Sequence, residues 1–436
     1  MSSKQEVVRF LEWEGPARSG LVSKRLQIPG SSLRRIFKSL GDKVLKVGKA
    51  RATTYALRRG IDGVRTPVPV YEVRPDGSVR AALRLHPVQP FGYYVESLCD
   101  AVESGFHETR LQPSAGWGDL PWFLHDLKPE GYLGRAWLRA NASQGYPRRL
   151  AQWGGDDVLR YAVEQGINLP GAWVVGEVQR GRLREPRPVL AGTLTERAER
   201  SPSSVLGGSS TGGEQPKFTM RQGAASMVKF SPPTDERSGA RWADLLLAEH
   251  LAARLLGAHG ITAASTEVVD EDARRFLVVK RFDRHGPHGR SGMVSLLSLD
   301  ADGVGSDIRS WGLVTAALQE RGSLSPADHE QARWLEAFGH LIANNDMHMG
   351  NLSLTLDGTT ITGLAPVYDM LPMFHAPRHG VIAQSLYDPR GQHDGFPSCA
   401  VALARRFWQE LREHPRRLRT LDAVCEGQLR LLPGAA

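Results

Sequence analysis

The sequence predicts an α+β protein of two or three domains, beginning with a small helical domain that ends in a β-hairpin. Three observations support this prediction. The chain has 436 residues, more than one hydrophobic core usually serves. Its first sixty residues have helical periodicity and carry the net positive charge. Its second half alternates strand-like runs, glycine-rich turns and apolar helices.

The composition excludes several classes of protein. At 41% hydrophobic and 23% charged residues, the chain is not disordered, collagenous or built on disulfides. No run of about 18 apolar residues occurs, and the N-terminus lacks the pattern of a secretion signal. Cys99, Cys399 and Cys425 are far apart and have no metal-ligand spacing. We therefore expect reduced thiols, no membrane partner and a cytoplasmic location.

The positive charge is concentrated at the N-terminus. Residues 1–60 hold 14 Lys and Arg against four acidic residues, a balance of +10, so the remainder of the chain carries −2. This distribution is typical of a nucleic-acid-binding module joined to a near-neutral body.

The periodicity of residues 1–60 predicts a first short helix around 7–11, a second over 19–26, a third that includes 33–40, and a hairpin from 43–47 and 52–57. This order is the layout of a winged helix-turn-helix, in which the third helix enters the DNA major groove. The DNA-binding candidates on that helix are Arg34, Arg35 and Lys38. The alternative is a basic helical bundle that docks a protein.

The region from residue 61 to about 200 begins with a Pro-rich linker at 64–73 and continues with short β-like runs and Gly/Pro turns. It contains no constellation of chemical residues, so the sequence predicts only a mixed, strand-containing region there.

A glycine-rich segment, LGGSSTGGEQPK (206–217), precedes the strand-like run MVKF (227–230). Glycines let a backbone approach phosphate oxygens closely, and loop N–H groups can cradle the charge. Gly213 is followed by Glu214 rather than lysine, which excludes a Walker loop. A Gly/Ser linker would have the same composition, so that interpretation stays open.

Lys229 is a lone lysine in the apolar run 227–230. A lysine on a central strand must pair or reach a ligand, because burying an unpaired ammonium is costly. Protein kinases place their phosphate-binding lysine on such a strand. The alternative is an edge strand whose lysine faces water.

The most informative segment is AFGHLIANNDMHMGNLSLTLDG (337–358), an apolar helix followed by a polar loop and a strand. Asp346 and Asn351 are five positions apart, the spacing of the kinase catalytic loop. In that loop the Asp accepts the substrate hydroxyl proton and the Asn holds magnesium.

Asp369 follows a second β-run, where a kinase carries its magnesium-binding aspartate. Asp346, Asn351 and Asp369 would therefore converge from the two ends of one hairpin. Four stretches in kinase order favour phosphoryl transfer over four unrelated turns.

These stretches resemble the HipA-type serine/threonine kinases, the toxin components of bacterial toxin–antitoxin systems. The resemblance rests on NDMHMGNLS (345–353), APVYDML (365–371), VVKRFDR (278–284), GGEQPK (212–217) and HDLKPEGYLGR (125–135). It covers roughly residues 65–430, and with the basic N-terminus it is strongest to the stand-alone HipH/YjjJ relatives. It implies a bilobal, protein-kinase-like (HipA-like) fold, ATP with Mg2+, and a protein substrate.

The implied domains are a winged helix-turn-helix over 1–62, an N-terminal kinase-like lobe over 63–285, and a mainly helical C-terminal catalytic lobe over 286–436. Asp346 would be the catalytic base, and Asn351 and Asp369 would be the metal ligands. The ATP-binding candidates are Gly212, Gly213, Gln215, Lys217, Lys229, Phe282 and His348. Either Asp244 or Glu249 would pair with Lys229.

The resemblance also implies self-regulation. In HipA-like kinases a serine of the glycine-rich loop is autophosphorylated, and here Ser210 is the candidate, with Ser209 as its alternative. A phosphate there would repel the phosphates of ATP. The best-known target of these kinases is an aminoacyl-tRNA synthetase.

Other functions remain open at this stage. The chain could be a DNA-binding regulator whose kinase-like domain senses nucleotide, or a DNA-directed nuclease toxin that uses the same carboxylates. A mononuclear metallohydrolase would use Asp346, His348, Asp369 and His375. A small-molecule kinase would share the Asp-to-Asn spacing. The target, the DNA site and the existence of an antitoxin are not encoded in any motif.

Overall fold

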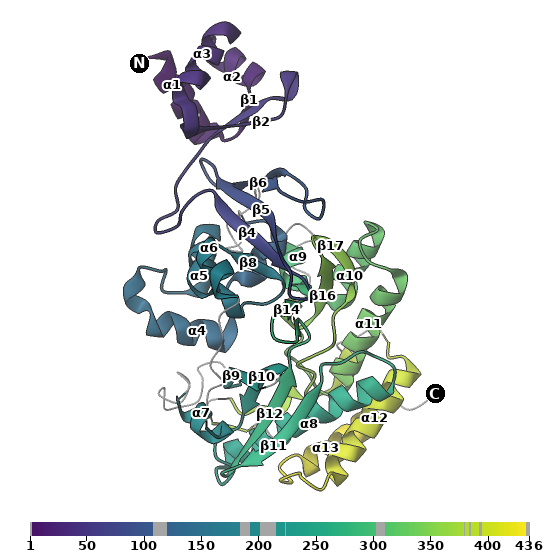
Figure 1. Ribbon diagram of the computed structural model, residues 1–436. Helices are drawn as coiled ribbons and strands as arrows, with labels where there is room; N and C mark the ends of the chain where they lie inside the picture. The colour runs from purple at the N-terminus through teal and green to yellow at the C-terminus, as the bar shows by residue number, and fades with distance from the viewer. Residues whose placement is uncertain are drawn as a thin grey trace.

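The computed structural model describes residues 2–107, 120–183, 192–200, 215–222, 224–301, 310–378, 380–382, 385–391 and 395–432. Within them, the helices and strands follow one another from an N-terminal helical unit to a helical C-terminal end (Figure 1).

The N-terminal unit has the element order that the sequence predicts. Its elements are α1 (Ser3–Glu14), β1 (Ala17–Arg18), α2 (Ser19–Leu26), α3 (Gly30–Leu40), β2 (Val44–Val47) and β3 (Thr54–Leu57). The strands form one antiparallel sheet in the order β1-β3-β2. Val7, Leu11, Val22 and Leu33 are buried in its core, as expected from the apolar stripes of the three helices.

The hairpin of β2 and β3 has two different faces, because successive side chains of a strand point to opposite sides. Lys46 and Tyr55 are cross-strand partners on one face, and the Tyr55 ring stacks on Phe37 of α3 with ring centroids 3.7 Å apart. Leu45 and Ala56 are partners on the other face, where both belong to a buried cluster with Val88. The hairpin is therefore shared between the N-terminal unit and the next sheet.

That next sheet is antiparallel, with the strand order β7-β6-β5-β4-β8. Its strands are β4 (Val68–Val73), β5 (Val79–Pro87), β6 (Tyr93–Ser97), β7 (Gly105–His107) and β8 (Trp173–Val175). The helices of this region are α4 (Gly131–Ala140), α5 (Gly155–Gln165) and α6 (Glu177–Arg182).

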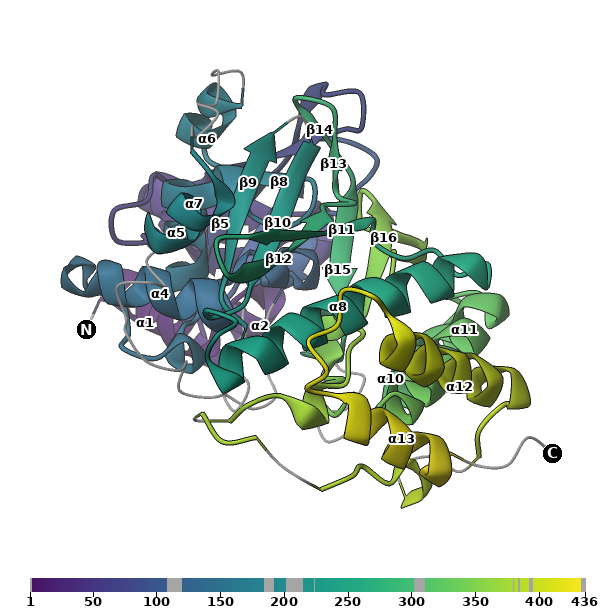
Figure 2. The same ribbon diagram turned by 90° about the horizontal axis from the view of Figure 1, so that it is seen from below.

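A four-stranded antiparallel sheet with the order β11-β12-β10-β9 holds the first part of the candidate site. It consists of β9 (Lys217–Gln222), β10 (Ala224–Phe230), β11 (Thr266–Glu271) and β12 (Arg274–Lys280), with α7 (Leu194–Arg200) ahead of it. Helix α8 (Arg237–Ala258) connects β10 to β11 and is buried along most of its length. Figure 2 shows α8 between this sheet and the C-terminal helices.

The C-terminal part is mainly helical and carries a small sheet in the order β15-β16-β17. Its elements are β13 (Arg284–His285), β14 (Gly289–Arg290), β15 (Gly292–Ser295), α9 (Leu296–Ala301), α10 (Trp311–Glu320), α11 (Pro326–Leu341), β16 (Ser353–Asp357), β17 (Thr360–Leu364), α12 (Ser398–Glu413) and α13 (Asp422–Leu431). Among the described helices, none has the length and apolar character needed to cross a bilayer.

Candidate active site

Lys229 lies on a central strand of the four-stranded sheet. Strand β10 is hydrogen-bonded to β12 on one side and to β9 on the other, so the alternative of an edge-strand lysine is wrong. The residue is 5% exposed. Its Nζ donates to Glu249 Oε1 at 2.6 Å, to Glu249 Oε2 at 2.8 Å and to Asp369 Oδ1 at 2.5 Å. One buried ammonium thus joins the sheet, α8 and the loop after β17.

The sequence leaves two carboxylates of α8 as partners for Lys229, and the geometry selects Glu249. Asp244, also buried, accepts hydrogen bonds from Leu418 N at 2.7 Å, Thr420 N at 2.9 Å and Thr420 Oγ1 at 2.8 Å. Asp244 therefore holds the segment before α13 against α8. Glu249 is the carboxylate of α8 that belongs to the candidate site.

The loop after α11 is held by its own side chains. Asn351 Nδ2 donates to the carbonyl oxygen of Asp346 at 2.7 Å, and Asp346 N donates to Asn344 Oδ1 at 3.1 Å. His348 Nδ1 accepts from Gly350 N at 3.1 Å. Asp346 and His348 are exposed to solvent, while Asn344 and Asn351 are buried. The loop therefore presents Asp346 outward on a fixed backbone.

Asn344 connects the two loops that carry the carboxylates. It is 1% exposed, and its Nδ2 donates to the carbonyl oxygen of Asp369 at 3.2 Å. Asp369 itself has φ of +56°, a left-handed conformation that costs a non-glycine residue free energy and that Asp tolerates better than most. The sequence motifs did not identify Asn344, although a polar residue at the end of an apolar helix is the signal that points to it.

Tyr368 connects Phe282, an ATP-binding candidate, to the loop that carries Asp346. Its hydroxyl donates to the carbonyl oxygen of Gly350 at 2.9 Å and lies 2.7 Å from Ser353 Oγ. Its ring stacks on Phe282, with centroids 6.1 Å apart and planes 24° apart. Phe282 follows β12 at a half-buried position, so the structure brings this ATP-binding candidate next to Asp369.

The charged groups of the site shift one another's pKa values. Burial alone would lower the pKa of Lys229, but Asp369 and Glu249 outweigh burial and raise it. Burial alone would raise the pKa of Asp369, but Lys229 and Lys217 lower it to about 2. Burial raises the pKa of Glu249 against the opposing effect of Lys229.

Asp346 differs from Asp369 in the direction of its shift. The surrounding protein withdraws its carboxyl from bulk water in spite of its exposed surface, and this desolvation raises its pKa. The charge of His348 opposes that rise and the charge of Asp369 adds to it. A raised pKa is common for a carboxylate that exchanges protons in a reaction.

Lys217 is the first residue of β9, and Gln215 lies two residues before it. Lys217 is the cross-strand partner of Lys229, and burial lowers its pKa while Asp369 opposes that shift. Gln215 Nε2 donates to the carbonyl oxygen of Phe230 at 2.6 Å, and its buried Oε1 has no partner among the described residues. The remaining predicted loop residues lie outside the described part of the chain; these are Ser209, Ser210, Gly212 and Gly213.

The donors available for a magnesium ion are oxygens. Asn351 donates from Nδ2 to Asp346, and its amide oxygen accepts no hydrogen bond among the described residues. Asp369 adds a carboxylate, and such hard oxygen donors suit Mg2+. No three His, Cys, Asp or Glu side chains of the described chain are grouped as a metal site.

His375, the fourth ligand of the metallohydrolase alternative, is fully buried, with its Nε2 3.3 Å from Gln428 Nε2 of α13.

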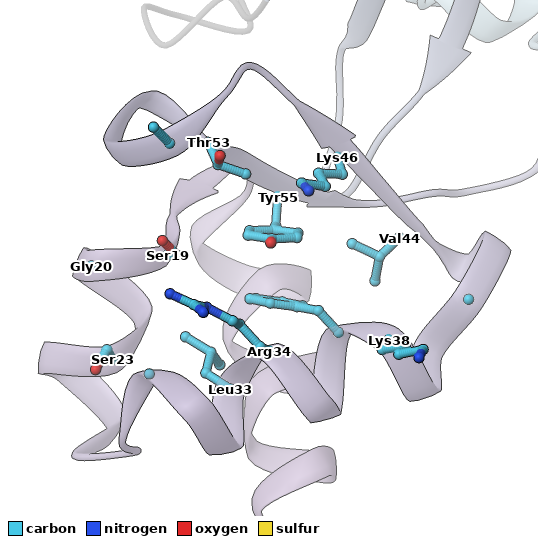
Figure 3. A pocket seen from close by; sticks show the side chains of 14 residues that line it. Ser19, Gly20, Ser23, Leu33, Arg34, Lys38, Val44, Lys46, Thr53 and Tyr55 are labelled. Atoms are coloured by element: carbon cyan, nitrogen blue, oxygen red, sulfur yellow. The ribbon is translucent and has the colours of Figure 1, made fainter.

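The DNA-binding candidates lie at the other end of the molecule in Figure 1, on α3. Arg34, Arg35 and Lys38 are all exposed. Arg34 and Lys38, one helical turn apart, line a groove of about 820 Å³ between α2, α3 and the hairpin (Figure 3). Arg35 is not among the residues that line this groove.

Comparison with known protein families gives two matches that follow one another along the chain. Residues 64–184 match the middle domain of the YjjJ-like toxins, and residues 209–426 match the HipA-like C-terminal domain. The chain is 34% identical to the toxin YjjJ of Escherichia coli (strain K12) over 421 residues, which cover 92% of each protein.

Solved structures add a comparison of folds. The chain resembles one in the complex of HipA, HipB and operator DNA from the Shewanella oneidensis MR-1 toxin–antitoxin system, with a TM-score of 0.50 and 17% identity over 84% of this chain and 92% of that one. A more distant match is the Helicobacter pylori proinflammatory kinase CtkA, with a TM-score of 0.36 and 13% identity over 57% of this chain and 92% of that one. The first of these likenesses shows a shared α+β fold of the HipA, kinase-like type.

Proposed function

The chain belongs to the YjjJ-like toxins of the HipA family, and we propose that it is an ATP- and magnesium-dependent serine/threonine protein kinase. One observation carries the proposal: Lys229 Nζ contacts both Glu249 and Asp369, and Asn344 ties Asp369 to the loop of Asp346. A lysine, its helical glutamate and two loop carboxylates are the groups that phosphoryl transfer needs in one place.

In this proposal ATP binds beside Lys229 and Lys217. Both ammonium groups lie on adjacent strands, where they would attract the phosphates. Phe282, already stacked against Tyr368, would lie along the adenine, and His348 would face the phosphates from the loop. Gln215, Gly212 and Gly213 are the remaining ATP-binding candidates of this proposal.

Asp346 acts as the catalytic base in this mechanism. The oxygen of a substrate serine or threonine attacks the γ-phosphorus while the bond from that phosphorus to the β-phosphate oxygen breaks, which releases ADP. The hydroxyl proton passes to Asp346. The hydrogen bonds of Asn344 and Asn351 hold the backbone of Asp346 in place for this transfer.

Asn351 and Asp369 would hold magnesium, which when bound would offset the negative charge of the ATP phosphates. For Asp369 to do so, its contact with Lys229 must be shared with the ion. The pKa of about 2 keeps the Asp369 carboxylate ionised and available at neutral pH.

The proposal includes DNA binding by the N-terminal unit. Helices α1–α3 followed by the β2–β3 hairpin have the order of a winged helix-turn-helix, and Arg34, Arg35 and Lys38 are exposed on α3. Residues 1–62, 63–285 and 286–436 would then be the DNA-binding domain and the two kinase lobes. A HipB-like antitoxin, a protein substrate such as an aminoacyl-tRNA synthetase, and a cytoplasmic location complete the proposal.

The test uses purified full-length protein, Mg2+ and a cell lysate, with ATP labelled at the γ-phosphate in one sample and at the α-phosphate in another. We expect label from the γ-phosphate alone, recovered on serine or threonine of a protein. Absence of protein label, or label recovered only in a small molecule, would contradict the proposal. Cleavage of plasmid DNA without protein label would favour the nuclease alternative.

A further inference from the structure

The groove beside α3 in the N-terminal unit has a chemistry of its own. Fourteen side chains and glycines line it, and all of them lie in the described part of the chain. They come from the start of α2, one face of α3 and one face of the β2–β3 hairpin. Three of the fourteen are cations, and none is acidic.

The cations lie on both walls of the groove. Arg34 and Lys38 belong to α3, and Lys46 belongs to the hairpin on the opposite side (Figure 3). All three side chains are exposed, and none of them is hydrogen-bonded or ion-paired within the described part of the chain. Three unpaired cations around one hollow would neutralise an anion held between them.

The floor of the groove narrows the choice of anion. Phe37 and Tyr55 stack face to face across it with an angle of 9° between the planes, so their facing surfaces cannot stack on a nucleobase. Proteins that bind single strands stack bases on open aromatic faces, which the facing sides of this pair do not offer. Ser19, which is half-buried, also lines the groove (Figure 3), and its hydroxyl can donate to a phosphate oxygen.

Contacts on the far face of the β2–β3 hairpin hold the hairpin wall of the groove in place. Leu45 and Ala56, on its far side, pack with Val88, and Gln89 N donates to the carbonyl oxygen of Leu57 at 2.8 Å. Arg59 donates from Nε to the carbonyl oxygen of Val88 at 3.0 Å. A wall fixed in this way loses little conformational entropy when a ligand binds.

We propose that this groove binds the sugar–phosphate backbone of duplex DNA, and that Lys46 of the hairpin contacts phosphate together with Arg34 and Lys38 of α3. The inference rests on the DNA-binding part of the proposed function and makes it specific. It adds Lys46 to the binding residues, and it gives Arg35, which lies outside the groove, a smaller share of the binding energy.

The experiment measures binding of a fluorescent mixed-sequence DNA duplex to the full-length protein across a range of salt concentrations. The groove variant is Arg34→Gln/Lys38→Gln/Lys46→Gln. The matched control is Arg9→Gln/Lys24→Gln/Arg25→Gln, which removes three exposed positive charges from α1 and α2 that do not line the groove.

We expect the groove variant to bind at least about tenfold more weakly near 100 mM salt, and its slope of log affinity against log salt to be shallower by about 2 to 3. The control variant should stay within about threefold of wild type. Equal weakening of both variants would overturn the groove while leaving DNA binding in place. Absence of duplex binding by wild type at low salt would overturn both, and would leave kinase activity untouched.

A second pair of variants tests the groove without changing charge. Gly20 lines the groove in α2, and a Cβ built on it meets no atom within 4 Å. Gly20→Leu should therefore fold. Its side chain should obstruct the DNA backbone in the groove and lower duplex affinity at least about fivefold, because it excludes phosphate contacts. Gly60→Leu is its control, because Gly60 is an exposed glycine after β3 that does not line the groove and whose Cβ would also meet no atom within 4 Å. Wild-type affinity of Gly20→Leu for duplex DNA would contradict binding of the DNA backbone in this groove.

Discussion

Two buried carboxylates of α8 have different partners, and this difference between single residues distinguishes the proposed catalytic role of Glu249 from the structural role of Asp244. Glu249 contacts Lys229, whereas Asp244 accepts three hydrogen bonds from residues 418 and 420. The mutations Glu249→Gln and Asp244→Asn each remove one charge and change little volume, so they form a matched pair.

We predict that Glu249→Gln lowers kcat/KM at least about tenfold, because Lys229 then pairs with Asp369 alone and draws that carboxylate away from its proposed role. Asp244→Asn should instead lower the free energy of unfolding by about 1–3 kcal/mol, because it removes an acceptor from buried donors. Urea unfolding and initial phosphorylation rates, measured on both variants, check this. The reverse pattern would contradict the assignment of Glu249.

The opposite pKa shifts of the two loop aspartates predict the pH dependence of the reaction. Asp346 must be deprotonated to accept the hydroxyl proton, and its pKa is raised above the ordinary value of 3.8. Asp369, with a pKa of about 2, stays ionised over the same range. On acidification kcat/KM should therefore fall at a higher pH than an unperturbed Asp would give, with a single acidic limb. A rate that stays flat down to pH 4 would contradict Asp346 as the base.

At the scale of elements, a histidine under the hairpin makes the joint between the N-terminal unit and the next sheet sensitive to acid. His86 Nδ1 lies 2.6 Å from Arg58 Nη1, and its Nε2 lies 2.8 Å from Glu96 Oε2. Burial lowers the pKa of His86, Glu96 opposes that shift and Arg58 adds to it. The folded protein thus binds this proton less readily than the unfolded chain does.

Because the folded pKa of His86 lies below the unfolded value of 6.5, its contribution to stability is present above pH 6.5 and is lost as pH falls below it. The loss is at most about 1.4 kcal/mol per pH unit. The variant His86→Gln should flatten the decline in free energy of unfolding between pH 6.5 and 5.5, as measured by urea denaturation. A decline equal to that of wild type would show that His86 does not titrate in this way.

Elements whose signal is local could be predicted from the sequence. The stripe of Leu33, Phe37 and Leu40 is sufficient to identify α3, and the Asp346-to-Asn351 spacing identifies the candidate loop without any distant contact. The partner of Lys229 could not be predicted, because Asp244 and Glu249 lie on the same helix and only the packing of residues 418–420 on α8 separates them.

The two-faced hairpin also depends on distant contacts. Alternation in β2 and β3 indicates that Lys46 and Leu45 face opposite ways, but not that Leu45 meets Val88. Asn344 and Tyr368 were missed for the same reason. Each connects two segments of the chain, Asn344 to Asp369 and Tyr368 to Gly350. Asn344 lies just before NDMHMGNLS and Tyr368 lies within APVYDML, but neither motif indicates these contacts.

At the scale of the whole molecule, the proposed kinase should limit its own activity. A phosphate on Ser210 would add about two negative charges to the segment proposed to bind the ATP phosphates, and repulsion should lower ATP affinity. We predict that incubation with ATP and Mg2+ phosphorylates Ser210, with Ser209 as the alternative site. The variant Ser210→Ala should stay active longer than wild type.

Mass spectrometry of the intact protein and its peptides checks this prediction, with Asp346→Asn as the control that should remain unmodified. Phosphate found only outside residues 206–217 would contradict it. A Ser210→Ala protein that inactivates as fast as wild type, with Ser209 also replaced, would contradict it as well.

The most direct test of the central claim is the initial rate of γ-phosphate transfer from ATP to protein by wild type, Asp346→Asn and Asp357→Asn. Asp357 is an exposed aspartate at the end of β16, outside the candidate site, so its replacement controls for loss of one carboxylate. We predict a loss of at least about 100-fold for Asp346→Asn, at unchanged circular dichroism, and a wild-type rate for Asp357→Asn. Equal rates for Asp346→Asn and wild type would contradict it.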